Sequence, residues 1–336
     1  MAEQAVVVEN LVKHYPGPVR AIDGVSFQVE SGSIFGFLGP NGAGKSTTIR
    51  ILTTLALPTQ GRATVGGFDV VYEPESVRRS VGVALQEIGI DPLMKPLELL
   101  TLQGQLFGAS RAAAGARAQE LVELIGLTEE VGRRTGTYSV GMRRRLDLAM
   151  ALVHEPEVLF LDEPTTGLDP ASRRDIWREL RRLNGELGIT IFLTTQHMEE
   201  ADELAERVVI LDRGRIAAEG SPARLKASVG SESLNLLFET RELAEKAMVE
   251  LAAVGYQVQL DRDVVRLYVS QAAEAIPTVL NRLRQAETPS ISLTLTQPTL
   301  DDVFLQVTGR RLEMHHIPTT QGPQTGGQSG VEVNGT

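Results

Sequence analysis

The 336-residue sequence contains no cysteine, which excludes disulfides, thiolate catalysis and cysteine-ligated zinc or iron–sulfur clusters. Long apolar runs are also missing. A membrane-spanning helix needs about 20 mostly apolar residues, whereas uncharged stretches such as residues 31–44 and 187–198 are shorter and contain Gly, Pro, Thr or Gln. The amino terminus lacks the basic and apolar segments of a secretory signal. If the protein acts at a membrane, we expect it to act there as a peripheral subunit.

Basic residues are in deficit. Asp and Glu total 43 and Lys and Arg total 33, which gives a net charge of −10. Such a chain has no overall electrostatic attraction to nucleic acid, so we predict no nucleic-acid partner. Hydrophobic residues make up 42% and charged residues 23% of the chain, which is typical of globular proteins. The length favours two domains.

Residues 1–222 are predicted to form one α/β domain. Runs such as residues 158–161 are apolar without alternation, which is typical of strands buried on both faces of a parallel sheet. Residues 87–155 have mostly helical patterns and are expected to form an inserted helical subdomain. The predicted strands lie at residues 5–8, 25–29, 34–38, 81–84, 158–161, 189–193 and 208–211.

A second pattern occupies residues 223–310. Predicted strands and helices follow one another in the order β-α-β-β-α-β, which indicates a small ferredoxin-like α+β domain. Residues 300–309 are expected to form a closing helix. Residues 311–336 are rich in Gly, Gln, Thr and Pro and are predicted to be a flexible tail.

A glycine-rich segment carries the clearest chemistry. Residues 39–46 read Gly-Pro-Asn-Gly-Ala-Gly-Lys-Ser, the G-x-x-x-x-G-K-S pattern of a phosphate-binding loop, between a predicted strand and a helix. The glycines let backbone N–H groups converge on phosphate oxygens, and the helix N-terminus favours negative charge. Lys45 is expected to reach the β- and γ-phosphates of a nucleotide and Ser46 to bind Mg²⁺, although this loop alone does not choose between GTPases, kinases, helicases and transport ATPases. The nucleotide contacts are predicted at Gly39, Pro40, Asn41, Gly42, Ala43, Gly44, Lys45, Ser46 and Thr47.

Two adjacent acids end the buried strand at residues 158–161. Ligands bind at the carboxyl edge of open α/β sheets, so Asp162 is placed to hold Mg²⁺. Glu163 is the candidate general base for the attacking water.

Other motifs resemble those of the ABC ATPases. The segment Tyr138-Ser139-Val140-Gly141-Met142 resembles the family signature Leu-Ser-Gly-Gly-Gln, and Ser139 can cap the following helix. Four further positions match family marks in the expected order. They are Tyr15 (adenine-stacking aromatic), Gln86 (Q-loop), residues 166–169 with Asp169 (D-loop), and Gln196, which stands where most members have the switch histidine.

A narrower resemblance reaches to Gly309. Residues 138–147, 193–196 and 299–305 look like those of the daunorubicin/doxorubicin-resistance type of ABC-2 exporter ATPase. The resemblance implies a head-to-tail dimer of nucleotide-binding domains with two ATPs between them, or a pair with a sister subunit. It also implies a separate ABC-2 membrane permease, a place at the cytoplasmic face of the cell membrane, and a hydrophobic drug, antibiotic or lipid as substrate.

The same resemblance assigns roles to individual residues. Ser139 and Gly141 would contact the γ-phosphate held by the opposite subunit's Lys45. Asp169 would cross the dimer seam, and Gln86 would sense Mg²⁺ or the lytic water. Gln196 joins Glu163 and Lys45 among the expected catalytic residues, whereas the neighbouring His197 is expected to be a surface or packing residue.

Val140 departs from the signature pattern, which has glycine at this position. A β-branched residue resists positive φ, so Val140 either strains the motif or is tolerated because its side chain points away. In the first case, Val140→Gly is predicted to raise ATPase activity.

The remaining features have ordinary interpretations. Arg143, Arg144 and Arg145 are expected on a solvated face or beside acidic partners, Trp177 in the core, and His315 and His316 in no metal site. The alternative functions are an ABC ATPase that acts without a permease, of the translation or DNA-repair type, and a nucleotide-binding regulatory module with little catalysis.

Overall fold

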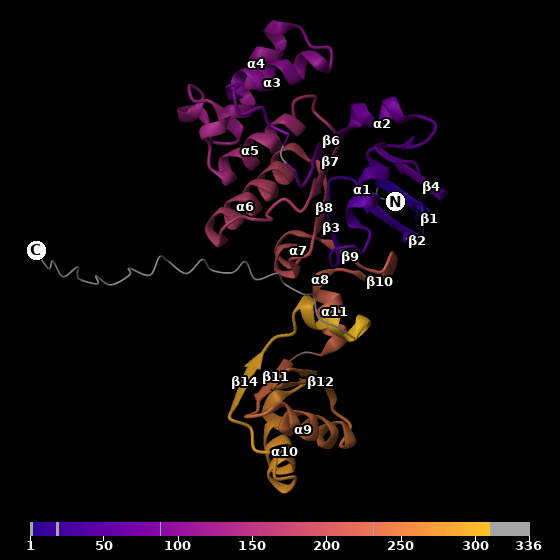
Figure 1. The fold of residues 1–336 in the computed structure, drawn as a ribbon, viewed down its shortest axis with the longest axis vertical. Helices are drawn as coiled ribbons and strands as arrows, with labels where there is room; N and C mark the ends of the chain where they lie inside the picture. The colour runs from indigo at the N-terminus through magenta and orange to yellow at the C-terminus, as the bar shows by residue number, and fades with distance from the viewer. Residues whose placement is uncertain (1–2, 18–19, 88, 231, 310–336) are drawn as a thin grey trace, which may run out of the picture.

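The computed structural model describes residues 3–17, 20–87, 89–230 and 232–309. The predicted tail and the His315–His316 pair therefore lie outside the described residues. Figure 1 shows three regions along the long axis: a helical region with α3 and α4 at one end, a central sheet region, and a small α/β unit at the other end. None of the helices in these described ranges is both long and apolar enough to cross a membrane.

A six-stranded sheet forms the centre, with the strand order β10-β9-β3-β8-β7-β6. All neighbouring strands are parallel except β10 and β9. Every residue of β3, β7 and β8 is buried, as the continuous apolar runs predict. The strands are β3 (Ile34–Leu38), β6 (Val81–Ala84), β7 (Val158–Asp162), β8 (Thr190–Thr195), β9 (Arg207–Asp212) and β10 (Arg215–Gly220).

Alternate side chains of these strands enter two different cores. On one face, aromatic rings lie in contact with centroids between 5.2 and 5.9 Å apart. They pack with the helix α1 (Lys45–Leu52) and a second sheet, β2-β1-β4-β5. On the other face, the leucines and isoleucines pack with α3 to α6. The rings are Phe27, Phe35, Phe37, Phe160 and Phe192. The second sheet comprises β1 (Gln4–His14), β2 (Arg20–Glu30), β4 (Gln60–Val65) and β5 (Phe68–Asp69).

Three helices of this part begin at residues whose side chains cap them. The side chains of Ser110, Ser139 and Asp169 accept hydrogen bonds from the first turns of α4, α5 and α6, a common way to satisfy free N–H groups. The helices of this part are α2 (Pro74–Ser80), α3 (Pro96–Leu106), α4 (Arg111–Leu124), α5 (Val140–Ala151), α6 (Pro170–Leu187) and α7 (Met198–Leu204).

Some elements were not predicted from the sequence. Strands β4, β5 and β10 are short or lie at a sheet edge, and β10 alternates between exposed and half-buried residues, so they lack the continuous apolar signal. Helices α2 and α3 begin at prolines, which favour the first helical turn but interrupt an apolar pattern.

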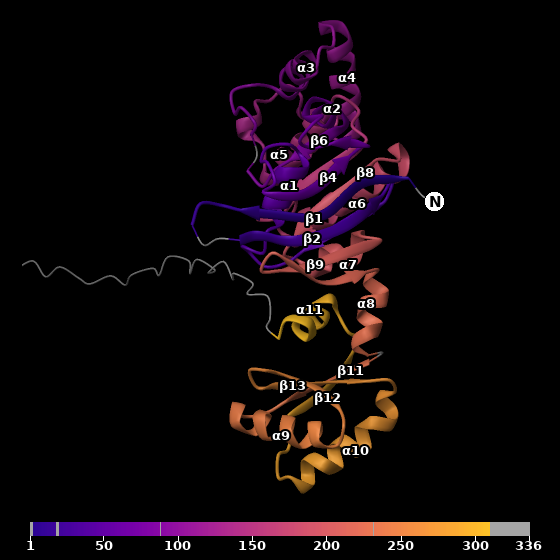
Figure 2. The same ribbon diagram turned by 90° about the vertical axis from the view of Figure 1, so that its right-hand side faces the viewer.

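Beyond α8 (Pro222–Val229), the chain forms a third sheet with the order β12-β13-β11-β14, in which all pairs are antiparallel. Two helices cover one face and share a core with it. The last described helix, α11 (Leu300–Thr308), lies beside α8, between the central region and this sheet, in both views (Figures 1 and 2). The elements are β11 (Glu232–Leu237), α9 (Arg241–Ala253), β12 (Gln257–Asp261), β13 (Val264–Val269), α10 (Ala272–Gln285) and β14 (Ser292–Thr296).

Candidate nucleotide site

A cleft of about 420 Å³ opens at the carboxyl ends of the central strands. It gathers most of the residues that the sequence assigns to one nucleotide. Arg20 and Ala21 also line it, and no sequence pattern pointed to them. The predicted residues in its lining are Tyr15, Pro40, Asn41, Gly42, Gly44, Lys45, Ser46, Thr47, Gln86 and Glu163. Of the other loop residues, Gly39 meets Lys45 through its carbonyl and Ala43 is buried.

The loop between β3 and α1 depends on glycine at its end. Gly44 caps α1 with φ 113°, a backbone conformation that other residues rarely adopt. A Cβ atom at Gly44 would collide with the carbonyl oxygen of Ala21. This is the predicted strand–loop–helix arrangement, in which the first free N–H groups of α1 point toward the cleft.

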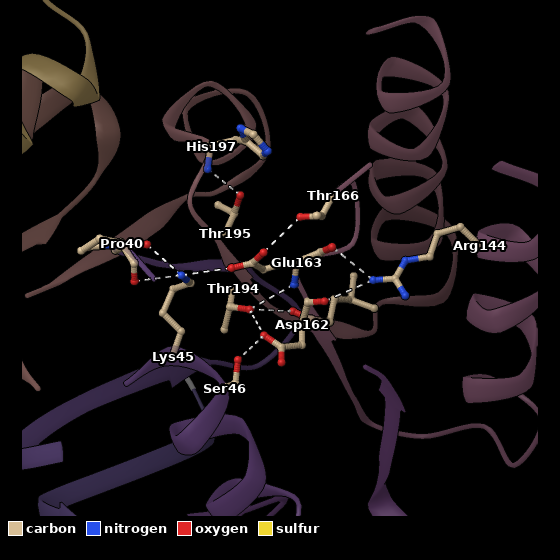
Figure 3. Close-up of polar contacts among 12 residues, drawn as sticks. Pro40, Lys45, Ser46, Arg144, Asp162, Glu163, Thr166, Thr194, Thr195 and His197 are labelled. Carbon is tan, nitrogen blue, oxygen red and sulfur yellow. Dashed lines mark hydrogen bonds and ion pairs between the residues drawn. The ribbon is translucent and has the colours of Figure 1, made fainter. Parts of the chain in front are cut away.

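Lys45 is almost fully buried and holds the loop closed on itself. Its Nζ donates to the carbonyl oxygens of Gly39 (2.8 Å) and Pro40 (3.3 Å) and pairs with Oε1 of Glu163 at 3.1 Å (Figure 3). The ammonium group is therefore fixed beside the loop amides, where a phosphate group can replace the carboxylate as its partner.

Glu163 follows β7 in a left-handed backbone conformation, with φ 51°. Such a conformation costs a residue with a side chain about 1–2 kcal/mol. Several hydrogen bonds hold Glu163 in this conformation. Its backbone N–H donates to the carbonyl (3.0 Å) and hydroxyl (3.1 Å) of Thr194, and its Oε2 accepts from Thr166 at 3.1 Å. The turn points the carboxylate toward Lys45 rather than along the strand (Figure 3).

Asp162 is the last residue of β7 and is buried. Its Oδ1 accepts hydrogen bonds from Ser46 Oγ at 3.2 Å and from Thr194 Oγ1 at 2.6 Å. The Ser46 hydroxyl and the Asp162 carboxylate thus meet at the edge of the cleft, as expected for two ligands of one cation. Gln86 lines the same cleft, but no hydrogen bond joins its side chain to either residue in the described structure.

A second group of predicted residues lies away from this cleft. Ser139 caps α5, and its Oγ accepts from Met142 N at 3.2 Å. Gly141 lies next to Ser172, whose hydroxyl donates to Asp169 at 2.5 Å. Hydrogen bonds from the Ser172 hydroxyl and backbone lower the pKa of Asp169. The exposed Ser139 and Asp169 and the half-buried Gly141 therefore belong to a separate surface of the chain, outside the cleft.

Comparisons with known proteins place this site in a family. The ABC transporter family model matches residues 22–166. The chain is 42% identical over 309 residues to the daunorubicin resistance ATP-binding protein DrrA3 of Streptomyces coeruleorubidus, covering 92% of this chain and 97% of that protein. It is 35% identical to the linearmycin resistance ATP-binding protein LnrL of Bacillus subtilis, covering 90% and 98%. The chain belongs to the ABC transporter ATP-binding family.

A solved structure supports the same assignment. The dimeric, post-hydrolysis state of an ATP-binding cassette bound to ADP and Pi is 26% identical, covers 64% of this chain and 98% of that chain, and has a TM-score of 0.58. The protein is therefore an ABC ATPase, which binds ATP and hydrolyses it.

In this ABC ATPase, Val140 occupies the first helical position of α5, and its side chain is 45% exposed. Its φ is not positive. The strain that a β-branched residue would cause at a left-handed position is absent here. That the side chain points away from a bound phosphate stays a prediction.

Gln196 and His197 connect β8 to α7, and both are half-buried outside the cleft lining. The backbone N–H of His197 donates to Thr195 Oγ1 at 2.9 Å, and its ring points away from the Lys45–Glu163 pair in Figure 3. Burial lowers the pKa of His197; the charges of Arg173 and Lys45 lower it further, and those of Glu163 and Glu199 oppose them. Which of the two residues meets the nucleotide stays a prediction.

Of the two expectations for Arg144, the solvated face was wrong, whereas the acidic partner is present as Asp147. Its guanidinium is buried and binds five oxygens. Figure 3 shows it beside Asp162 and Glu163. Four are backbone carbonyls that no sequence pattern reveals: Leu85 (2.7 Å), Asp162 (3.2 Å), Glu163 (3.3 Å) and Pro164 (2.9 Å). The fifth belongs to Asp147 (2.9 Å). Arg144 thus fixes the backbone of Glu163 and of the residue before Gln86 to the helix that begins at the signature segment.

Proposed function

We propose that this ABC ATPase is the energy-supplying subunit of an exporter whose ABC-2 permease is a separate chain. It would act as a peripheral subunit at the cytoplasmic face of the cell membrane and power the export of a hydrophobic drug, antibiotic or lipid. The observation that supports this most is the match with drug-resistance ATP-binding proteins, which extends over the C-terminal unit as well as the nucleotide site.

The described residues fit Mg–ATP. Mg²⁺ prefers one or two protein oxygens together with phosphate oxygens and water, and Ser46 and Asp162 offer such a pair. Bound Mg²⁺ would neutralise phosphate charge, and Gln86 is proposed as a further ligand. Tyr15 would stack on the adenine. Lys45, freed from Glu163, would bind the β- and γ-phosphates.

Exchange of the Lys45 partner suggests how the base is switched on. While Lys45 pairs with Glu163 at 3.1 Å, the ammonium group balances the negative charge of the carboxylate, which is then poorly placed to accept a proton. When Lys45 turns to the phosphates, Glu163 becomes free to accept the proton of the attacking water. The hydrogen bond from Thr166 would keep the carboxylate oriented during that exchange.

The separation of the two groups of site residues supports a head-to-tail dimer. Ser139 and Asp169 are exposed, Gly141 is half-buried, and all three lie outside the cleft of their own chain. In a dimer they would close over the nucleotide of the partner, with Gln196 completing the site, so that hydrolysis is coupled to closure.

We propose the domain division 1–222, with the helical subdomain at 87–155, and 223–310. The strand order β12-β13-β11-β14 with all pairs antiparallel supports a ferredoxin-like C-terminal domain, for which we propose a regulatory or dimer-supporting role.

A mild-detergent pull-down of the tagged protein from native membranes, with mass spectrometry of co-purifying chains, tests the proposal. A stoichiometric multi-span permease is expected. Recovery only with ribosomes or DNA would overturn the exporter role in favour of an ABC ATPase that acts without a permease.

A further inference from the structure

Glu200 is a buried acid with no place in the chemistry described so far. It lies in the first turn of α7, the helix that begins directly after His197. Its exposed fraction is 0%. It therefore cannot touch the nucleotide or water in the cleft. A carboxyl group without solvent is costly unless its hydrogen bonds are made, so its retention in this position calls for a structural or functional reason.

The neighbours of Glu200 come from three different elements. Its Oε1 accepts from Trp177 Nε1 of α6 at 3.0 Å. The hydroxyls of Thr195, at the end of β8, and Thr165, in the loop after Glu163, lie close enough to act on its pKa. Arg173 is the charged group that acts on it. Burial raises the pKa of Glu200, and the nearby donor groups of Thr195, Thr165 and Trp177 and the charge of Arg173 oppose that rise.

Both threonines stand at the start of a loop with a proposed role in catalysis. Thr195 Oγ1 accepts from the backbone N–H of His197, so its own hydrogen is left to donate toward Glu200. Thr165 is followed by Thr166, which holds Glu163, and its backbone carbonyl accepts from Leu168 N at 3.2 Å, next to Asp169. Glu200 thus sits between the 195–197 loop and the 165–169 loop.

The network is incomplete in this state. Glu200 Oε2 and Thr165 Oγ1 are buried, and neither has a hydrogen-bond partner of good geometry among the described residues. Buried polar groups are normally satisfied. A small movement of the two loops toward each other would complete the missing bond, because the Thr165 hydroxyl can donate to Glu200 Oε2.

We propose that Glu200 is a positioning residue that ties the 195–197 loop to the 165–169 loop through Thr195, Thr165 and Trp177, so that the two loops move as one unit when nucleotide binds. The inference rests on the proposed roles of Gln196 and Asp169. It adds that the two residues are set in place together by one buried acid that never touches the nucleotide.

The first test separates positioning from mere stability. E200Q keeps the oxygen that accepts from Trp177 and gains an amide that can donate to Thr165, so kcat is expected within about two-fold of the wild type. The double variant W177F/E200L removes the buried donor together with its acceptor, which limits the loss of stability, but it removes the tie as well. Its kcat is expected to fall about ten-fold or more, as misplaced catalytic groups do, with KM for ATP within about two-fold.

E199Q, which neutralises the exposed acid on the same helix, is the matched control and should keep wild-type kcat. A folded W177F/E200L variant with kcat within about two-fold of the wild type would show that Glu200 only fills the core. Equal losses in E199Q and W177F/E200L would contradict the proposal as well.

The second test uses Trp177, the single tryptophan of the sequence, as a native reporter. In the E163Q background, which is expected to bind ATP without turning it over, Mg–ATP should change the Trp177 emission, and adding E200L should abolish that change. A fluorescent ATP analogue that binds while Trp177 emission stays constant would overturn the tie but leave the proposed function intact. Absence of any nucleotide binding would instead refute the site assignments.

Discussion

Lys45 and Glu163 form an ion pair in the described state, and we propose that nucleotide binding separates them. The carboxylate is in a left-handed backbone conformation that Thr194 and Thr166 stabilise. Strain of this kind is typical of functional positions. Glu163, the ion-pair partner of Lys45, therefore owes its orientation toward that lysine to its left-handed backbone conformation.

Glu163→Gln should keep ATP binding and reduce turnover by roughly 10²-fold or more, since a general base contributes about that much. The amide preserves the size of the side chain and its hydrogen bond to Thr166. Equilibrium binding of a fluorescent ATP analogue and steady-state phosphate release measure the two effects. Wild-type turnover in this variant would remove Glu163 from the role of base.

Val140→Gly is not expected to raise ATPase activity, because the backbone strain on which that expectation depended is absent. Because Val140 is helical and exposed, glycine relieves nothing and costs about 0.5–1 kcal/mol of helix stability. ATP turnover should stay within about two-fold, and the melting temperature should fall slightly. A clear rise in turnover would mean that closure requires a backbone conformation at residue 140 that this state does not show.

At the scale of elements, α5 connects the signature segment to the catalytic strand. Arg144 projects from its first turns to the carbonyls of Asp162, Glu163 and Pro164 and to the end of β6 at Leu85. A buried guanidinium that binds carbonyls needs a countercharge, which Asp147 supplies one turn later. Movement of α5 would therefore shift the backbone of both Glu163 and the Gln86 loop.

Asp147 gives this connection a pH dependence. Burial raises the pKa of Asp147 to about 6, although the charge and hydrogen bond of Arg144 lower it. Because the folded pKa lies above the unfolded value of 3.8, the folded protein holds the proton more tightly. Its contribution to stability is greatest at low pH and declines as the pH rises from about 4 to about 6.

Asp147→Asn should remove this dependence. Relative to the variant, the wild type should lose up to about 3 kcal/mol of stability between pH 4 and pH 7, since one pKa unit corresponds to 1.36 kcal/mol. Thermal melts of both proteins across this range measure the difference. Parallel pH curves for the two proteins would show that Asp147 does not carry the effect.

At the scale of the whole molecule, α11 joins the C-terminal unit to the ATPase. Its apolar residues Leu300, Val303 and Phe304 share a core with α7 and α8, and α7 directly follows the Gln196–His197 loop. Its polar side is anchored by Asp302, whose carboxylate accepts from Arg266 at 2.7 Å and Tyr268 at 3.0 Å and caps its own helix at Thr299.

Asp302 should stabilise the folded protein most at pH values above about 4, where its carboxylate is charged in both the folded and the unfolded chain. Burial raises the pKa of Asp302, but hydrogen bonds from Thr299, Arg266 and Tyr268 outweigh it, so the pKa is lowered from 3.8. A lowered pKa adds stability above the unfolded value, and this stability is lost as the pH falls through the folded value. Asp302→Asn is expected to cost about 2 kcal/mol at pH 7 and progressively less below pH 4, as measured by denaturant unfolding. An equal loss of stability in Asp302→Asn at pH 7 and below pH 4 would show that the charge of Asp302 does not contribute.

The sequence by itself determined the parts of this protein that depend on neighbours along the chain. The phosphate-binding loop at residues 39–46, the acids that end β7, the buried strands and the order of elements in the C-terminal unit all follow from local spacing and apolar pattern. Each signal lies within one strand–loop–helix segment, where backbone geometry follows from residue type.

Only the tertiary structure decided which distant groups meet. The carbonyl partners of Arg144, the placement of Glu200 between two loops, and the division of the site between a cleft and a separate surface have no local signature. Every residue has a backbone carbonyl, so the sequence does not indicate which carbonyls an arginine will bind. An arginine or glutamate is expected at the surface unless its burial is known. Packing of α5, α6 and α7 against the sheet supplies that burial, and with it the roles of these charges.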